Sequence, residues 1–69
     1  MRDMPRTLEE LAKMIARRDY ISYEEALAVV RDCAAEMEQA FMNGSLTEAE
    51  DILAQDLGLE LDYLDLFIF

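Results

Sequence analysis

The stretch SYEEALAVVRDCAAEMEQAFMNG, residues 22–44, decides the fold of this chain. Its apolar side chains fall within an arc of about 120° when each residue advances a helix by about 100°. They are Tyr23, Ala26, Leu27, Val30, Cys33, Ala34, Met37 and Phe41. Asn43-Gly44 ends the pattern, because glycine readily takes the left-handed conformation that follows a helix. We therefore predict one long helix over residues 23–42.

Three hydroxyl residues, each followed three positions later by a glutamate, mark the starts of helices. The pairs are Thr7 with Glu10, Ser22 with Glu25, and Thr47 with Glu50. In such a capping box the hydroxyl accepts the backbone N–H of the glutamate, whose side chain reaches back to the capping residue. Together with the apolar spacing, the three boxes predict main helices over about residues 8–18, 23–42 and 48–57.

The final segment, LELDYLDLFIF (residues 59–69), is ambiguous. We interpret Asp62 as a cap that precedes a short helix over about residues 63–68. An edge strand is the alternative, although the chain offers no other convincing strand for it to pair with. The apolar side chains of this segment must close the bundle or form an interface. The predicted fold is therefore all-α, a small helical bundle of three main helices plus a short C-terminal helix, in one domain over residues 1–69.

Charge divides the chain into two halves. All six basic residues lie in the first 31 positions, together with six acids, whereas residues 32–69 hold ten acids and no base. The whole formal net charge of −10 therefore belongs to the second half. A negative surface repels nucleic acid and anionic lipid, so we expect no direct nucleic-acid partner and no membrane partner. One unpaired cysteine and the lack of a signal-peptide pattern after Met1 favour the cytoplasm.

The residue types that carry most catalysis are missing. The chain has no histidine, and both glycines fit helix ends, which leaves no phosphate-binding loop. Cys33 lies on the apolar stripe and is expected to be a buried structural thiol. The acids around Glu48 lack the glycine and the spacing of a calcium loop. We therefore predict that the protein is not an enzyme and has no catalytic residues, no cofactor and no metal.

Residues 7–45, TLEELAKMIARRDYISYEEALAVVRDCAAEMEQAFMNGS, resemble the N-terminal helical hairpin of the HU-type bacterial histone-like proteins. Both have a short capped helix, a turn ending in Ile-Ser, then Glu-Glu-Ala and a long amphipathic helix that closes at Asn-Gly. In that family the long helix supplies much of a dimer interface, so the resemblance assigns Val30, Cys33, Met37 and Phe41 to subunit contacts. DNA binding is not carried over, because this chain continues into an acidic segment where the family has basic strands.

These features predict a non-enzymatic, acidic protein–protein interaction domain that forms a homodimer or binds another protein. The candidate hydrophobic interface comprises Val30, Cys33, Met37, Phe41, Tyr63, Phe67 and Phe69. The candidate acidic face comprises Glu48, Glu50, Asp51, Glu60, Asp62 and Asp65. The alternative function is an acidic inhibitor or DNA mimic of the anti-restriction or anti-CRISPR type, which acts on a nucleic-acid-handling enzyme. In size and charge the chain is similar to short acidic helical proteins of phages and conjugative elements, and the acids also serve solubility.

Overall fold

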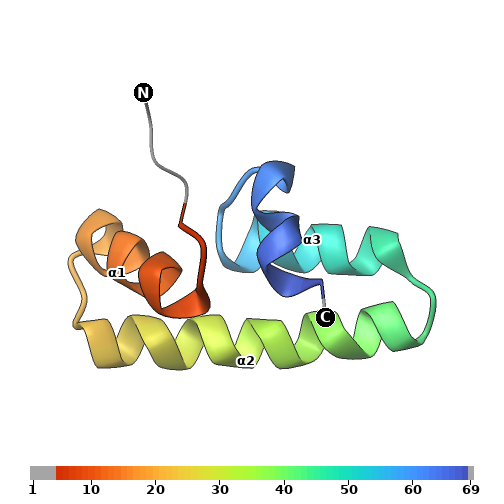
Figure 1. Cartoon of the computed structure of the whole chain (residues 1–69), viewed down its shortest axis with the longest axis horizontal. Helices are drawn as coiled ribbons and strands as arrows, with labels where there is room; N and C mark the ends of the chain where they lie inside the picture. Colours follow the sequence, from red (N-terminus) through yellow and green to blue (C-terminus); the bar gives the residue numbers. More distant parts are fainter. Residues whose placement is uncertain (1–4, 69) are drawn as a thin grey trace. The chain divides into compact units, whose positions relative to one another are not determined.

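A computed structural model describes residues 5–68 of the chain. In chain order the elements are the α-helices α1 (Leu8–Asp19), α2 (Tyr23–Met42) and α3 (Leu46–Asp56) and the 3₁₀-helix η1 (Leu61–Phe67), as shown in Figure 1. The predicted all-α fold of three main helices and a short C-terminal helix is confirmed. None of the helices in the described part of the chain is long and apolar enough to cross a membrane.

The chain divides into two compact units within α2: unit 1, Met1–Arg31, and unit 2, Asp32–Phe69. Helix α2 contributes its first half to unit 1 and its second half to unit 2. Unit 1 has as many basic as acidic residues, whereas unit 2 has ten acids and no base. The division of charge in the sequence is therefore also a structural division.

Unit 1 is a helical hairpin of α1 and the first half of α2, and both helices are capped. The Thr7 hydroxyl accepts the backbone N–H of Glu10 at 3.1 Å, and the Glu10 carboxylate accepts the N–H of Arg6 at 3.4 Å. The Ser22 hydroxyl accepts the N–H of Glu25 at 3.1 Å at the start of α2. These bonds satisfy N–H groups that have no partner inside a helix. The buried apolar side chains of unit 1 are Leu11, Ala12, Ile15, Ala26 and Val30.

Helix α2 ends in a tight left-handed turn at Gly44, which has a φ of 73°. The N–H of Gly44 donates to the carbonyl of Phe41 at 3.0 Å, and the N–H of Ser45 donates to that of Ala40 at 2.8 Å. This pair of bonds is the Schellman motif, in which a left-handed residue satisfies the last carbonyls of a helix. The sequence prediction of both ends of α2 matches the structure.

Helix α3 begins directly after this turn, earlier than the sequence indicates. Its first residue is Leu46, and the N–H of Ala49 donates to the carbonyl of Ser45 at 3.3 Å. The predicted start at Glu48 is therefore two residues late, and the predicted cap at Thr47 is wrong, because Thr47 lies inside the first turn. Ser45 takes the capping position without a side-chain hydrogen bond.

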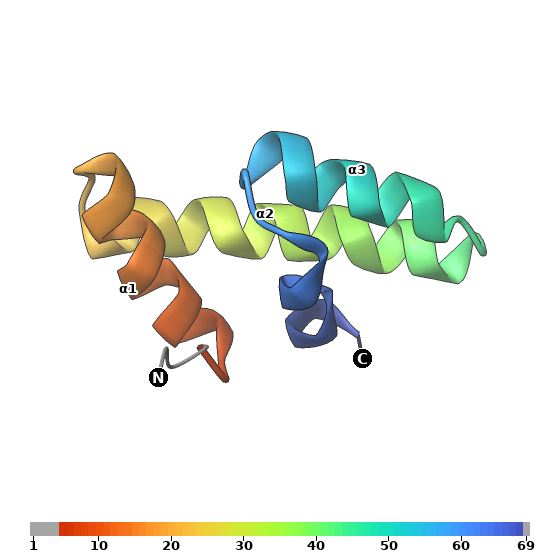
Figure 2. The same ribbon diagram turned by 90° about the horizontal axis from the view of Figure 1, so that it is seen from above.

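Unit 2 places α3 alongside the second half of α2, running in the opposite direction, as Figures 1 and 2 show from two sides. Gly58, with a φ of 64°, follows the end of α3, and η1 packs against α3. Because η1 begins at Leu61, Asp62 lies in its first turn and is not the predicted cap. The helical interpretation of this segment is confirmed. The buried side chains of unit 2 are Cys33, Ala34, Met37, Ala40, Ala49, Leu53, Leu57, Leu59 and Phe67.

Candidate interaction surfaces

The predicted hydrophobic interface is largely covered within the single chain. Four of its members are buried, namely Val30, Cys33, Met37 and Phe67. Phe41 and Tyr63 are half-buried, and Phe69 lies outside the described residues. The participation of this set in subunit contacts stays a prediction. Among the described members of the set, Phe41 and Tyr63 are the two that a partner can reach directly.

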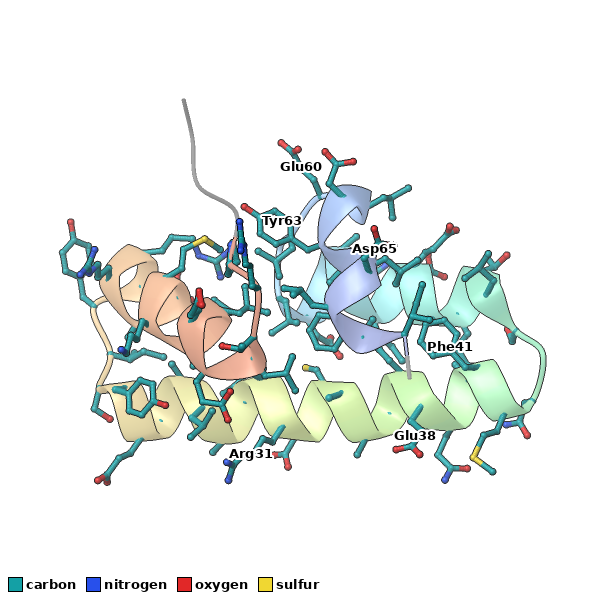
Figure 3. All side chains as sticks on the ribbon, in the orientation of Figure 1. Arg31, Glu38, Phe41, Glu60, Tyr63 and Asp65 are labelled. Carbon is teal, nitrogen blue, oxygen red and sulfur yellow. The ribbon has the colours of Figure 1, made fainter. Side chains whose placement is uncertain are left out.

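A surface hollow of about 370 Å³ lies beside Phe41. Glu38, Phe41 and Met42 of α2 line it together with Ile68, the residue that follows η1. The first three lie on one face of α2, because residues three and four apart are neighbours on a helix. Figure 3 shows Phe41 on the side of α2 that faces the end of the chain. We refer to these four side chains as the apolar hollow.

The apolar hollow exposes much of its lining to solvent. Met42 is 73 % exposed and Ile68 is 58 % exposed, whereas Phe41 is half-buried. Sequence reasoning identified Phe41 but missed Met42 and Ile68. Met42 and Ile68 come close together only because the C-terminal segment folds back to the end of α2. No local sequence pattern predicts this proximity. Three apolar side chains that border a hollow are typical of an interface.

The predicted acidic face is accessible to solvent. Glu50 is half-buried and the other five members are exposed, namely Glu48, Asp51, Glu60, Asp62 and Asp65. Figure 3 shows Glu60 and Asp65 on the η1 side of unit 2 and Glu38 on α2. The exposed acids are therefore spread over α2, α3 and the η1 segment and do not belong to a single element.

The two units differ in how they neutralise their acids. In unit 1, the Arg18 Nε lies 2.8 Å from the Asp19 Oδ1, and this hydrogen bond lowers the pKa of the Asp19 carboxyl. Unit 2 has no lysine or arginine, so none of its ten acids can form an ion pair within the unit. The negative charge of unit 2 is therefore available for screening by solvent and ions or for contact with a partner.

Cys33, Glu36 and Asp56 form a mixed cluster in unit 2 that sequence reasoning missed. The Cys33 Sγ and one carboxylate oxygen from each acid lie within 4.8 Å of one another. Burial raises the pKa of the Cys33 thiol to about 11, and the charge of Asp56 is the next largest contribution. Such a thiol is protonated at neutral pH and is a poor nucleophile. The spacing of Cys33 and Glu36 was visible in the sequence, but the approach of Asp56 depends on the packing of α3.

Comparison with known proteins adds no relative: no protein-family model, curated protein or solved structure matches the chain. The resemblance of residues 7–45 to the HU-type hairpin therefore stays a prediction.

Proposed function

We propose that this protein is a non-enzymatic protein–protein interaction domain that pairs with a second copy of itself through the apolar hollow. The observation that carries the proposal is the exposure of Met42 and Ile68, 73 % and 58 %, around one concave surface. Exposed apolar side chains that are scattered singly are ordinary, whereas a group of them around a hollow is typical of an interaction site.

A second copy suits this surface because the exposed side chains of Met42 and Ile68 border the hollow that they would fill in a partner. In a two-fold symmetric contact the same patch serves both subunits, so Met42 or Ile68 of one copy can enter the hollow of the other. Chains of this size commonly gain stability from oligomerisation. The resemblance of residues 7–45 to a dimerising hairpin points in the same direction, although this contact uses the exposed end of α2 and not its buried stripe.

Binding without catalysis agrees with the chemistry of the side chains present. The polar side chain in the lining of the apolar hollow is a single carboxylate, from Glu38, and the other three side chains are apolar. The high pKa of the Cys33 thiol keeps it protonated at neutral pH. We assign the protein to the cytoplasm, where a reducing environment preserves an unpaired thiol.

Sedimentation equilibrium of matched variants tests the homodimer. At about 100 μM chain, far above a micromolar Kd, we expect a dimer. Ile68→Ser and Met42→Ser should each shift the protein toward the monomer. Leu61→Ser is the matched control, because Leu61 is 54 % exposed and does not line the apolar hollow. A strict monomer at this concentration, or a dimer that tolerates both hollow variants, contradicts the proposal.

A second candidate function is the acidic inhibitor, and one observation favours it. Nine of the ten acids of unit 2 are exposed, namely Asp32, Glu36, Glu38, Glu48, Asp51, Asp56, Glu60, Asp62 and Asp65. Affinity capture from the native cell at low and high salt, with mass spectrometry, tests this function. A nucleic-acid-handling enzyme that is released by salt supports it, and the absence of any such enzyme contradicts it.

A further inference from the structure

Two helices bring three metal-ligating groups together in unit 2. Cys33 and Glu36 are three residues apart on α2 and therefore share a face, and Asp56 is the last residue of α3. Their ligand atoms lie within 4.8 Å of one another. The two carboxylates belong to exposed residues and can rotate, whereas the buried thiol is held in place.

The Cys33 thiol is the observation that separates this cluster from ordinary surface acids. Cys33 is 5 % exposed, and its thiol takes part in no hydrogen bond between described residues. A buried polar group normally has a hydrogen-bond partner. The Cys33 sulfur lies within 4.8 Å of one carboxylate oxygen of Glu36 and one of Asp56, which can each donate a lone pair to a cation.

The electrostatics of the cluster are unfavourable without a cation. Two carboxylates lie close to each other in a unit that has no basic residue. Asp56 also occupies the C-terminal end of α3, where the helix dipole disfavours an anion. A divalent cation would neutralise both carboxylates. It would also interact favourably with the negative, C-terminal end of the α3 dipole.

We propose that Cys33, Glu36 and Asp56 bind a thiophilic divalent transition-metal ion of the Zn²⁺ class. A thiolate ligand argues against Mg²⁺ and Ca²⁺, which prefer oxygen alone, and two carboxylates argue against Cu(I), which prefers sulfur. Zn²⁺ accepts one sulfur at about 2.3 Å and carboxylate oxygens at about 2.0–2.2 Å. The two carboxylates, which belong to exposed residues, would rotate to reach these distances, and water would complete the coordination.

Metal binding forms a sulfur–metal bond and releases the thiol proton to solvent, so that one proton leaves for each ion bound. The bound ion ties α2 to the end of α3. It therefore acts as a staple for a small unit, a role that metals often take in short chains.

Co²⁺ titration of the reduced, full-length chain tests the site. We expect one equivalent of Co²⁺ to produce a near-ultraviolet thiolate-to-cobalt charge-transfer band, together with visible bands of a low coordination number. Zn²⁺ should abolish these bands at one equivalent, whereas excess Mg²⁺ should leave them unchanged. Absence of the charge-transfer band at stoichiometric Co²⁺ overturns the proposal.

Matched variants distinguish Co²⁺ binding at the three cluster residues from the general attraction of a cation to an acidic surface. Cys33→Ser should abolish the charge-transfer band, and Glu36→Gln and Asp56→Asn should each weaken Co²⁺ binding by about tenfold or more. Glu48→Gln and Asp51→Asn are the controls, because they remove the same charges from unit 2 outside both the cluster and the apolar hollow. Circular dichroism checks that each variant is folded. Equal losses in the cluster and control variants overturn the proposal.

Discussion

The backbone N–H of Ile21 donates to the carbonyl of Ala16 at 3.1 Å across the end of α1. The residue that allows this turn is Tyr20, which has a φ of 58° and whose own N–H donates to the same carbonyl. The corresponding position after α2 is a glycine, Gly44. Both helices therefore end in a left-handed residue, and in both the next N–H donates to a carbonyl five positions earlier, but α1 uses a side-chain-bearing residue for which this conformation is unfavourable.

Replacement of Tyr20 by glycine should stabilise the protein. The left-handed conformation costs a non-glycine residue roughly 1–2 kcal/mol, and the greater flexibility of unfolded glycine offsets about half of this. Tyr20 is 95 % exposed, so few packing contacts are lost. We expect the free energy of unfolding to rise by about 0.5 kcal/mol in urea titrations. Tyr20→Ala keeps the strain and serves as the control. A destabilised Tyr20→Gly would show that the ring contributes more than its exposure indicates.

The three hydroxyl residues that the sequence identifies as caps should respond differently to alanine. Thr7→Ala and Ser22→Ala each remove a hydrogen bond to a first-turn N–H, and each should lower the free energy of unfolding by about 1 kcal/mol. Thr47→Ala should change it by less than about 0.5 kcal/mol, because Thr47 lies inside α3 and alanine favours helix. Denaturant titrations of the three variants provide the measurement. A loss at Thr47 as large as that at Ser22 would contradict the observed start of α3.

The contrast between Ser22 and Thr47 explains how far the sequence predicts the fold. Both residues precede a glutamate at the same spacing, and at Ser22 the local signal is sufficient. Before Thr47, however, the left-handed Gly44 already turns the chain, so that Ser45 takes the capping position two residues earlier. Ser45 and Thr47 are two positions apart, and each is followed three positions later by a glutamate, so they offer the same local chemistry. Only the geometry of the preceding turn selects between them.

The candidate sites depend even more on tertiary structure. The sequence identifies Cys33 as buried, which is correct, but its nearness to Asp56 follows from the antiparallel course of α2 and α3. Likewise, Ile68 reaches the end of α2 only because η1 folds back. Helix boundaries that depend on capping and stop residues can be predicted from local spacing. Contacts between side chains of different elements cannot, because they depend on how those elements pack.

Neighbouring residues at the C-terminus should show opposite sensitivities. Phe67 has no exposed surface, whereas Ile68 is 58 % exposed. Phe67→Ala should lower the free energy of unfolding by about 3–5 kcal/mol, which can unfold so small a protein. Phe67→Leu keeps most of the volume and should lower it by about 1.5 kcal/mol or less, a change that denaturant titration can measure. Ile68→Ala should change monomer stability by less than about 0.5 kcal/mol. Equal effects at the two positions would contradict the observed burial.

Deprotonation of Cys33 should destabilise the metal-free protein at alkaline pH. Its pKa is raised from 9.0 to about 11 in the folded chain, so the folded state holds the thiol proton more tightly than the unfolded state. The stability from this group is complete below about pH 9 and is lost as the pH rises toward 11. We expect the difference in stability between the native protein and Cys33→Ala to shrink over this range in the presence of a chelator. Groups common to both proteins cancel in that difference. A constant difference would contradict the raised pKa.

Salt should strengthen the proposed homodimer. Each copy carries a net charge of −10, all of it in unit 2, which also holds the apolar hollow, so the two copies repel each other. Raising the salt from about 50 mM to about 500 mM shortens the range of this repulsion and leaves the apolar contact intact. Sedimentation equilibrium should therefore give a lower dimer Kd at the higher salt.

A dimer that dissociates on addition of salt would require attractive charge pairs. Because unit 2 has no basic residue, those pairs would have to involve unit 1, and the contact surface would then not be the apolar hollow alone.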